Sequence, residues 1–100
     1  SENAIASYKA LIADRMARHK RYPRSAQRRR QEGIASLQFT VQRDGTVTAH
    51  KIIRSAGFRV LDREVENTLA RAAPFPPFPP DLAQDSLEIV VPIRFELIDN

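Results

Sequence analysis

Few residues of this chain have the types and spacing that enzymatic or metal chemistry requires. Its 100 residues include no cysteine and two histidines, His19 and His50, which lie far apart in the sequence. The lack of cysteine excludes thiolate chemistry, and no pair of histidines has the spacing of a metal site. Asp62, Glu64 and Glu66 lie near the start of an expected helix, where the helix dipole favours acids. We therefore expect a non-enzymatic protein with no catalytic residue, metal, cofactor or small-molecule substrate.

The strongest chemical signal is a basic segment in the first half of the chain. Residues 1–50 hold ten basic residues against four acids, whereas residues 51–100 hold six against eight. No acid interrupts the eight basic residues between Arg15 and Arg30. Such a segment can contact nucleic acid, anionic lipid or an acidic protein surface. Because Tyr22 is its single aromatic ring and no nucleic-acid-binding motif accompanies it, we interpret the segment as a solvated face beside a short helix.

The periodicity of the apolar residues predicts two main helices. Helical spacing predicts the first over residues 4–20, and Pro23 ends it because proline disfavours helical backbone at the preceding residue. One further short turn of helix is expected over residues 24–31. The second main helix is expected over residues 61–72, where apolar residues form one stripe.

Two strands and a tight turn are predicted between these helices. Residues 35–41 alternate between apolar and polar, which is typical of a strand with one buried face. Asp44-Gly45 then predicts a hairpin turn into a strand over residues 47–54 whose alternation is less regular. After the second helix, the proline-rich residues 74–80 predict an extended strap that returns the chain to the sheet, with Phe75 and Phe78 against the core.

The last strand, predicted over residues 87–97, carries the most information. Its odd-numbered residues are all large and apolar, so that face must be buried. Pro92 interrupts the polar face, and because proline has no N–H it belongs on an edge strand or at a bulge. The residues expected to present free backbone groups on the open side are Glu88, Val90, Arg94 and Glu96. Charges and proline can simply protect such an edge from aggregation, or the edge can receive an extended peptide.

Together these elements predict an α+β fold, with a small antiparallel three-stranded sheet packed against one or two helices. The sheet consists of a hairpin and the C-terminal edge strand. We expect residues 1–20 to form a helical extension and residues 21–100 to form one compact unit. The polar start of the chain, which lacks an initiating methionine, indicates a piece of a longer protein, and no apolar run approaches the length of a membrane span.

The sequence resembles the TonB C-terminal domain family from about Arg21 to Leu97. The matching motifs, in order, are Tyr22-Pro23 followed by Ala26, Glu32-Gly33, Asp44-Gly45, Ser55-Ala56-Gly57, Leu61-Asp62, Pro74-Phe75-Pro76-Pro77 and Val91-Pro92-Ile93-Arg94-Phe95. The helix up to Lys20 is similar to an extension seen in some members. Arg21 stands where better-known members carry a glutamine-containing stretch, which leaves the identity of the receptor open.

The resemblance implies a periplasmic domain of an energy transducer whose inner-membrane anchor and proline-rich spacer lie outside this sequence. Such a domain binds the TonB box of an outer-membrane receptor by strand addition. It transmits work from an Exb-type proton-channel complex to the receptor plug, so that siderophore, haem or cobalamin can enter. The residues implied in peptide binding are Arg21, Tyr22, Pro23, Ser86, Glu88, Val90, Pro92, Arg94 and Glu96. The residues expected to steer an acidic receptor rim are Arg24, Arg28, Arg29 and Arg30.

Two alternative functions and a possible dimer remain open from the sequence. A TolA-like domain, which bridges envelope proteins, has a related shape, although that branch is associated with disulfides. A basic nucleic-acid-binding domain would show steeply salt-dependent affinity for duplex DNA. A free sheet edge also permits two copies of the chain to pair as a homodimer.

Overall fold

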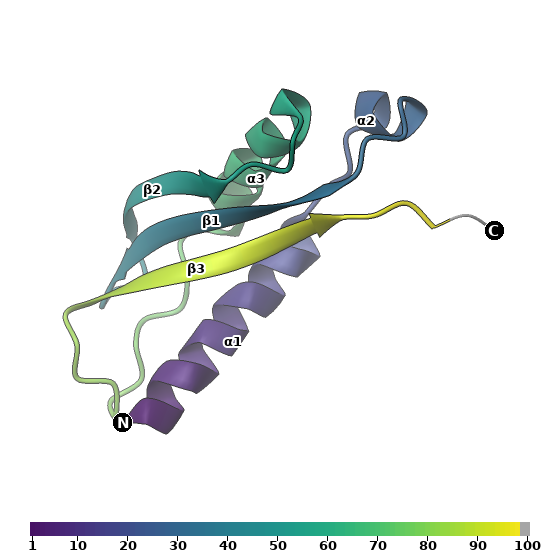
Figure 1. The fold of residues 1–100 in the computed structure, drawn as a ribbon. Coiled ribbons are helices and arrows are strands. Elements are labelled where there is room, and N and C mark those ends of the chain that lie inside the picture. The colour runs from purple at the N-terminus through teal and green to yellow at the C-terminus, as the bar shows by residue number, and fades with distance from the viewer. Residues whose placement is uncertain (99–100) are drawn as a thin grey trace.

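The computed structural model describes residues 1–98, which form one three-stranded sheet with its long helices on one face (Figure 1). The elements in chain order are α1 (Glu2–His19), α2 (Arg24–Arg28), β1 (Gly33–Gln42), β2 (Val47–Arg54), α3 (Arg59–Ala72) and β3 (Ser86–Phe95). The strand order is β2-β1-β3, and both pairings are antiparallel. The predicted fold class and the edge position of the last strand are confirmed.

The core lies between the helices and one face of the sheet. Alternate residues of β1 and β3 point into it and are nearly inaccessible to solvent: Ala35, Leu37, Phe39, Val41, Ile89, Val91, Ile93 and Phe95. The helix α1 adds Ile12 and Met16 to the same cluster, and α3 adds Leu61 and Val65. The opposite face of the sheet is open, and Val90 is 51% exposed there. The sheet therefore buries one face only.

The two pairings of β1 differ in regularity. With β3, the register runs without a shift from Gly33 opposite Phe95 to Gln42 opposite Ser86. With β2, the register shifts after Ser36 and again after Thr40. This confirms the irregularity that the sequence indicated for the second strand, and it makes the β1–β3 pairing the more regular of the two.

Several element ends differ from the predicted bounds. The helix α1 begins at Glu2 because the Ser1 hydroxyl accepts a hydrogen bond from the Ala4 amide at 3.1 Å and caps the first turn. β3 ends at Phe95, so the predicted edge residue Glu96 lies beyond the strand. The reason is that β1 begins at Gly33, the partner of Phe95. Glu96 therefore has no residue of β1 opposite it.

The proline-rich strap returns the chain from α3 to the sheet, as predicted, and it lies against the hairpin turn. The amide of Phe75 donates to the Gly45 carbonyl at 2.9 Å, and the amide of Phe78 donates to the Arg43 carbonyl at 2.9 Å. Both rings are buried, and Phe75 stacks on Phe39 with 5.9 Å between centroids. The strap therefore closes the core at the turn end of the sheet.

The first turns of α1 hold the other side of this strap. Tyr8 meets Phe78 edge-on at 4.9 Å between centroids, and its hydroxyl donates to the Pro76 carbonyl at 2.7 Å. Burial raises the pKa of Tyr8, and the nearby Arg15 partly opposes this effect. The strap is thus fixed between the hairpin and the N-terminal helix.

Two glycines allow the close approach of the strap to the turn to be tested. Gly45 has a φ of +93°, and a Cβ added there would lie 1.9 Å from the Phe75 carbonyl oxygen. Gly57 has a φ of +94°, but nothing lies within 4 Å of its added Cβ. We expect Gly57→Ala to lower the free energy of unfolding by about 1–2 kcal/mol through backbone strain alone. Gly45→Ala should cost clearly more in urea denaturation, because the strap must also move. Equal losses of unfolding free energy in the two variants would show that the strap is not in tight contact with the turn at Gly45.

Candidate functional site

The outer side of β3 is an open sheet edge. Within residues 1–98, β3 is the last strand of the sheet and pairs only with β1. The side chains of Glu88, Val90, Pro92 and Arg94 are all exposed on the solvent face. The strand therefore combines a buried apolar face with a long unpaired edge, which is the arrangement that strand addition requires.

The residues whose backbone turns outward can be assigned from Pro92 and Lys20. The ladder passes Pro92 without a register shift, and because proline has no N–H, Pro92 must belong to the outward-facing set. The Lys20 ammonium donates to the Arg94 carbonyl at 2.6 Å, so this carbonyl also points outward. Glu88 and Val90 are separated from Pro92 by an even number of positions, so their backbone groups also point outward. Each therefore offers an N–H and a C=O at the edge, whereas Pro92 offers a C=O alone.

The predicted Tyr22-Pro23 motif lies at the C-terminal end of β3. Tyr22 packs edge-on against Phe95 with 5.4 Å between centroids, and its hydroxyl donates to the Gln31 carbonyl. Burial is the main cause that raises the pKa of Tyr22, Glu32 adds to it, and Arg30 opposes it. Pro23 directly precedes α2, and its carbonyl accepts a hydrogen bond from the Gln27 amide at 3.0 Å. The structure therefore brings this motif next to Phe95, the last residue of β3.

Of the remaining predicted site residues, Ser86 lies apart from this cluster, whereas Glu96 and Arg21 lie beside it. Ser86 pairs with Gln42 at the opposite end of β3. Glu96 follows the strand and lies 3.7 Å from the Arg94 guanidinium, with both side chains exposed. The side chain of Arg21 is exposed, and its backbone amide donates a hydrogen bond to the Glu64 carboxylate.

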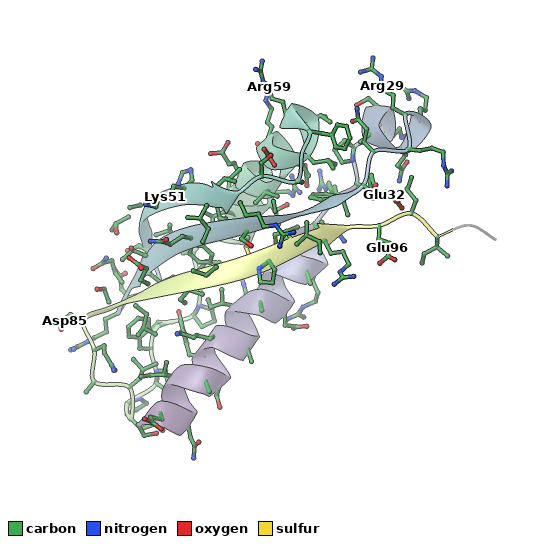
Figure 2. The ribbon with its side chains drawn as sticks, in the orientation of Figure 1. Arg29, Glu32, Lys51, Arg59, Asp85 and Glu96 are labelled. Atoms are coloured by element: carbon green, nitrogen blue, oxygen red, sulfur yellow. The ribbon has the colours of Figure 1, made fainter. Side chains whose placement is uncertain are left out.

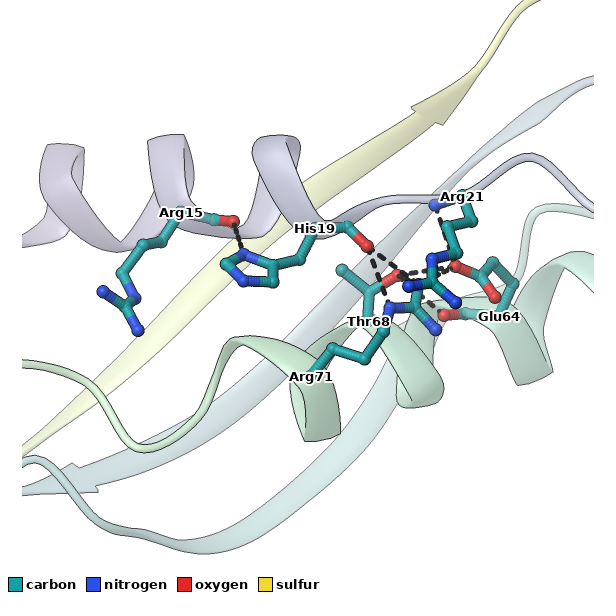
Figure 3. Close-up of polar contacts among 6 residues, drawn as sticks. All are labelled: Arg15, His19, Arg21, Glu64, Thr68 and Arg71. Carbon is teal, nitrogen blue, oxygen red and sulfur yellow. Dashed lines mark hydrogen bonds and ion pairs between the residues drawn. The ribbon is translucent and has the colours of Figure 1, made fainter.

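A buried ionic network fixes the segment before Tyr22 (Figure 3). Glu64, 8% exposed, accepts hydrogen bonds from the Arg21 amide and the Thr68 hydroxyl, both at 3.0 Å, and from the Arg71 guanidinium. Arg71 also donates to the His19 carbonyl at 2.8 Å. The network therefore ties the end of α1 to α3. The sequence alone predicts an ordinary acid near a helix start at Glu64, whereas the structure buries this side chain.

The basic segment between Arg15 and Arg30 does not form one surface. Arg15 donates to the Ala72 carbonyl at 3.2 Å, Arg18 pairs with Asp14 at 2.8 Å, and Lys20 lies at the edge of β3. These residues therefore point to three different places in the fold.

The remaining basic residues of this segment, Arg24, Arg28, Arg29 and Arg30, lie on α2 and in the turn that follows it. Arg29 and Arg59 project from the same end of the molecule (Figure 2). Arg29, Arg59 and Arg63 line a shallow hollow beside the exposed Phe58. Several exposed arginines thus lie at this end of the molecule.

A groove between α1 and β3 was not predicted from the sequence. It is lined by Ala13, Ala17 and Lys20 of the helical segment and by residues 91–94 of β3. Its one sequence signal is the spacing of two small residues four positions apart on a helix. The signal is weak because it acquires meaning only when the helix is placed beside the strand.

Neither histidine belongs to a metal cluster. The ring of His19 lies 2.9 Å from the Arg15 carbonyl, and that of His50 lies 3.4 Å from the Glu66 carboxylate. Over residues 1–98, no group of three potential metal ligands comes together. In the same part of the chain, no helix combines the length and the apolar character that crossing a bilayer requires.

Comparisons with known proteins agree with this geometry. The family described as Gram-negative bacterial TonB protein C-terminal matches residues 18–97. Protein TonB of Pseudomonas putida is 32% identical over 97% of the chain and 40% of its own length. The solution structure of the Helicobacter pylori TonB C-terminal domain superposes with a TM-score of 0.79 at 26% identity, covering 94% of this chain and 84% of that chain.

The structure of the HasB C-terminal domain is also similar, with a TM-score of 0.56 at 37% identity, covering 90% of this chain and 70% of that one. The chain spans 40% and 37% of the lengths of the TonB proteins of P. putida and Pasteurella multocida.

The buried network can be tested with two acids of the same helix. Glu64→Gln removes the charge that Arg71 faces at a buried position, so we expect the free energy of unfolding to fall by about 2–4 kcal/mol. Glu66→Gln is the matched control, because the Glu66 side chain is half-exposed and its contact with His50 is worth about 0.5 kcal/mol or less. Thermal and urea denaturation measure the loss of stability in each variant. Similar small losses in the two variants would contradict a structural role for the network.

Proposed function

The chain belongs to the TonB C-terminal family, and we propose that it binds the TonB box of an outer-membrane receptor as an added strand on β3. The observation that carries this proposal is the open edge of β3, which offers the backbone groups of Glu88 and Val90 and the carbonyl of Pro92. An extended peptide satisfies these groups by ordinary sheet pairing, and side-chain contacts on either face then supply specificity.

The affinity expected for a peptide bound by strand addition is suited to a contact that forms and breaks repeatedly. Each backbone hydrogen bond contributes about 0.5–1.5 kcal/mol net, so a few of them give a modest affinity unless side chains add to it. When force acts along the strand, these bonds are loaded together and must break together. The regular β1–β3 ladder behind them, from Gly33 to Gln42, carries the load into the core. This arrangement suits a domain that pulls on its partner.

In this proposal, the domain is the non-enzymatic periplasmic part of an inner-membrane-anchored transducer. An Exb-type complex supplies work from the proton-motive force, and the receptor plug responds by admitting a siderophore, haem or cobalamin. Family membership supports these steps.

The cationic end of the domain then meets the acidic rim of the receptor. The steering residues are those of α2 and its turn, with Arg59 and Arg63 of α3 beside them. Long-range attraction of this kind raises the association rate and fades with salt.

The backbone contribution can be tested at Val90. Val90→Pro removes one outward N–H at an edge position that tolerates proline, whereas Val90→Thr keeps the N–H and a similar shape. We expect a TonB-box peptide to shift the amide resonances of residues 86–95 in an NMR titration. The proline variant should bind about 3–10-fold more weakly, which corresponds to one lost hydrogen bond. The threonine variant should match the wild type. If the peptide leaves the amides of β3 unmoved, the proposal is wrong.

A further inference from the structure

We propose that the end of the domain formed by α2 and the start of α3 docks on an anionic phospholipid surface, with Phe58 inserted among the lipid headgroups. This inference concerns a surface other than the edge of β3, and it does not depend on strand addition. Three observations carry it: arginines without partners that line one hollow, an exposed aromatic ring beside them, and the uneven distribution of charge along the molecule.

The arginines of the hollow come from two segments that are distant in the sequence. Arg29, directly after α2, and Arg59 and Arg63 of α3 line one hollow of about 340 Å³. All three side chains are exposed, and within residues 1–98 none of their guanidinium groups has a hydrogen-bond or ion-pair partner. Like charges brought together in this way repel each other unless an anion joins them. The hollow therefore fits an anionic partner.

The acids at this end of the molecule are bound to other groups. The Asp62 carboxylate accepts hydrogen bonds from the loop before α3. Glu32 accepts a hydrogen bond from the Leu97 amide at 2.7 Å, and Glu96 lies 3.7 Å from the Arg94 guanidinium. The arginines of the hollow therefore keep their charge for a partner.

The opposite end of the molecule is acidic. Figure 2 shows Asp85 at the far end of the sheet from Arg29 and Arg59. The exposed acids of the strap, the hairpin turn and the start of α1 are Glu2, Asp44, Asp81 and Asp85. A charge distribution of this kind turns the arginine end toward an anionic surface and the acidic end away from it.

Phe58 is an unusual residue for its place in the fold. It is the residue that precedes α3, where serine, threonine, asparagine or aspartate is preferred because the side chain can accept a hydrogen bond from a free helix amide. Phe58 makes no such bond, is 38% exposed and does not belong to the hydrophobic core. It also lines the arginine hollow. An apolar ring surrounded by cations is the composition that enters the headgroup region of a bilayer.

The form of this end favours a lipid surface over an acidic protein. Arg24 and Arg28 are four positions apart on α2 and lie outside the hollow that Ser25 and Arg29 line. The positive charge therefore continues from the hollow over the outer side of α2. A protein partner needs a complementary shape, whereas a bilayer offers negative charge over a broad surface. All of these cations are arginines, whose guanidinium groups pair with phosphate oxygens through two parallel hydrogen bonds.

Docking through this end is compatible with peptide binding. The strands β1 and β3 run toward it, and the open edge of β3 lies along the side of the molecule (Figure 1). A bilayer in contact with α2 and the start of α3 would therefore leave Glu88 and Val90 free to pair with a peptide.

The test measures sedimentation of the 100-residue chain with vesicles of phosphatidylcholine alone or of phosphatidylcholine mixed with phosphatidylglycerol. We expect binding to the mixed vesicles only, and a steep loss of binding with added salt. Because each arginine near an anionic surface strengthens binding roughly fivefold, Arg59→Gln combined with Arg63→Gln should weaken it about 25-fold. The matched control, Lys9→Gln combined with Lys51→Gln, removes two exposed charges outside the hollow and should change binding less than about threefold.

The ring is tested with Phe58→Ser, which places a preferred residue before α3. We expect the urea midpoint of this variant to stay unchanged or to rise. Its affinity for the mixed vesicles should fall about tenfold, because the ring no longer enters the headgroup region. Phe58→Leu should keep most of the affinity. A purely structural role for Phe58 would instead lower the urea midpoint of the serine variant.

Three results would overturn the inference. The first is no binding to the mixed vesicles at low salt, and the second is an equal loss in the arginine and lysine variants, which would show that net charge alone acts. The third is binding of a polyglutamate peptide that is as tight as vesicle binding and insensitive to Phe58→Ser, which would assign the surface to an acidic protein.

The outcome is separable from that of the proposed function. A TonB-box peptide should shift the amides of β3 equally in the wild type and in the variant with Arg59→Gln and Arg63→Gln, because neither residue lies at the edge of β3. If vesicles bind but the peptide leaves β3 unmoved, strand addition fails and this inference stands. If the peptide binds and the vesicles do not, the reverse holds.

Discussion

The unshifted ladder between β1 and β3 is the interaction on which the other features depend. It presses Val91 and Ile93 onto the helices and leaves the outer side of β3 without a strand partner. A slip by one residue would turn both side chains to solvent and would bring Pro92 to a position where the ladder needs an N–H. The buried face and the proline therefore specify the same register, and that register defines the open edge.

The end of α1 is held by contacts that reach three other elements. Arg71 of α3 binds the His19 carbonyl, Glu64 holds the Arg21 amide, and Lys20 reaches the edge of β3. Tyr22 then packs on the last residue of β3. Because these contacts are consecutive in the sequence, the position of α1 relative to the edge is fixed within a few residues. A helix that looks like an appendage in the sequence is thus part of the core and a neighbour of the candidate site.

The parts of the fold that depend on local pattern could be predicted from the sequence. Alternation identified the strands, Asp44-Gly45 identified the turn, and Pro92 identified the edge, because each of these is a property of a short segment. The end of β3 was missed because it depends on where β1 begins, so Glu96 was placed in a strand that stops before it.

The missed parts of the site depend on contacts between distant segments. The burial of Glu64 requires Arg71 and the chain before Tyr22 to meet at one point. Likewise, the run of basic residues from Arg15 to Arg30 is continuous in sequence but is divided among a strap contact, an ion pair and a strand edge. Spacing alone could not place these groups.

The two edges of the sheet differ in a way that limits self-association. β3 offers a straight, regular edge, whereas the register of β2 with its neighbour shifts at two places. Two copies that met through β3 would use the same surface twice, and this symmetric contact would consume the regular edge of both. The irregular β2 edge is poorly suited to extend such a pair. Growth by edge pairing would therefore stop at two copies and would not continue into a fibre.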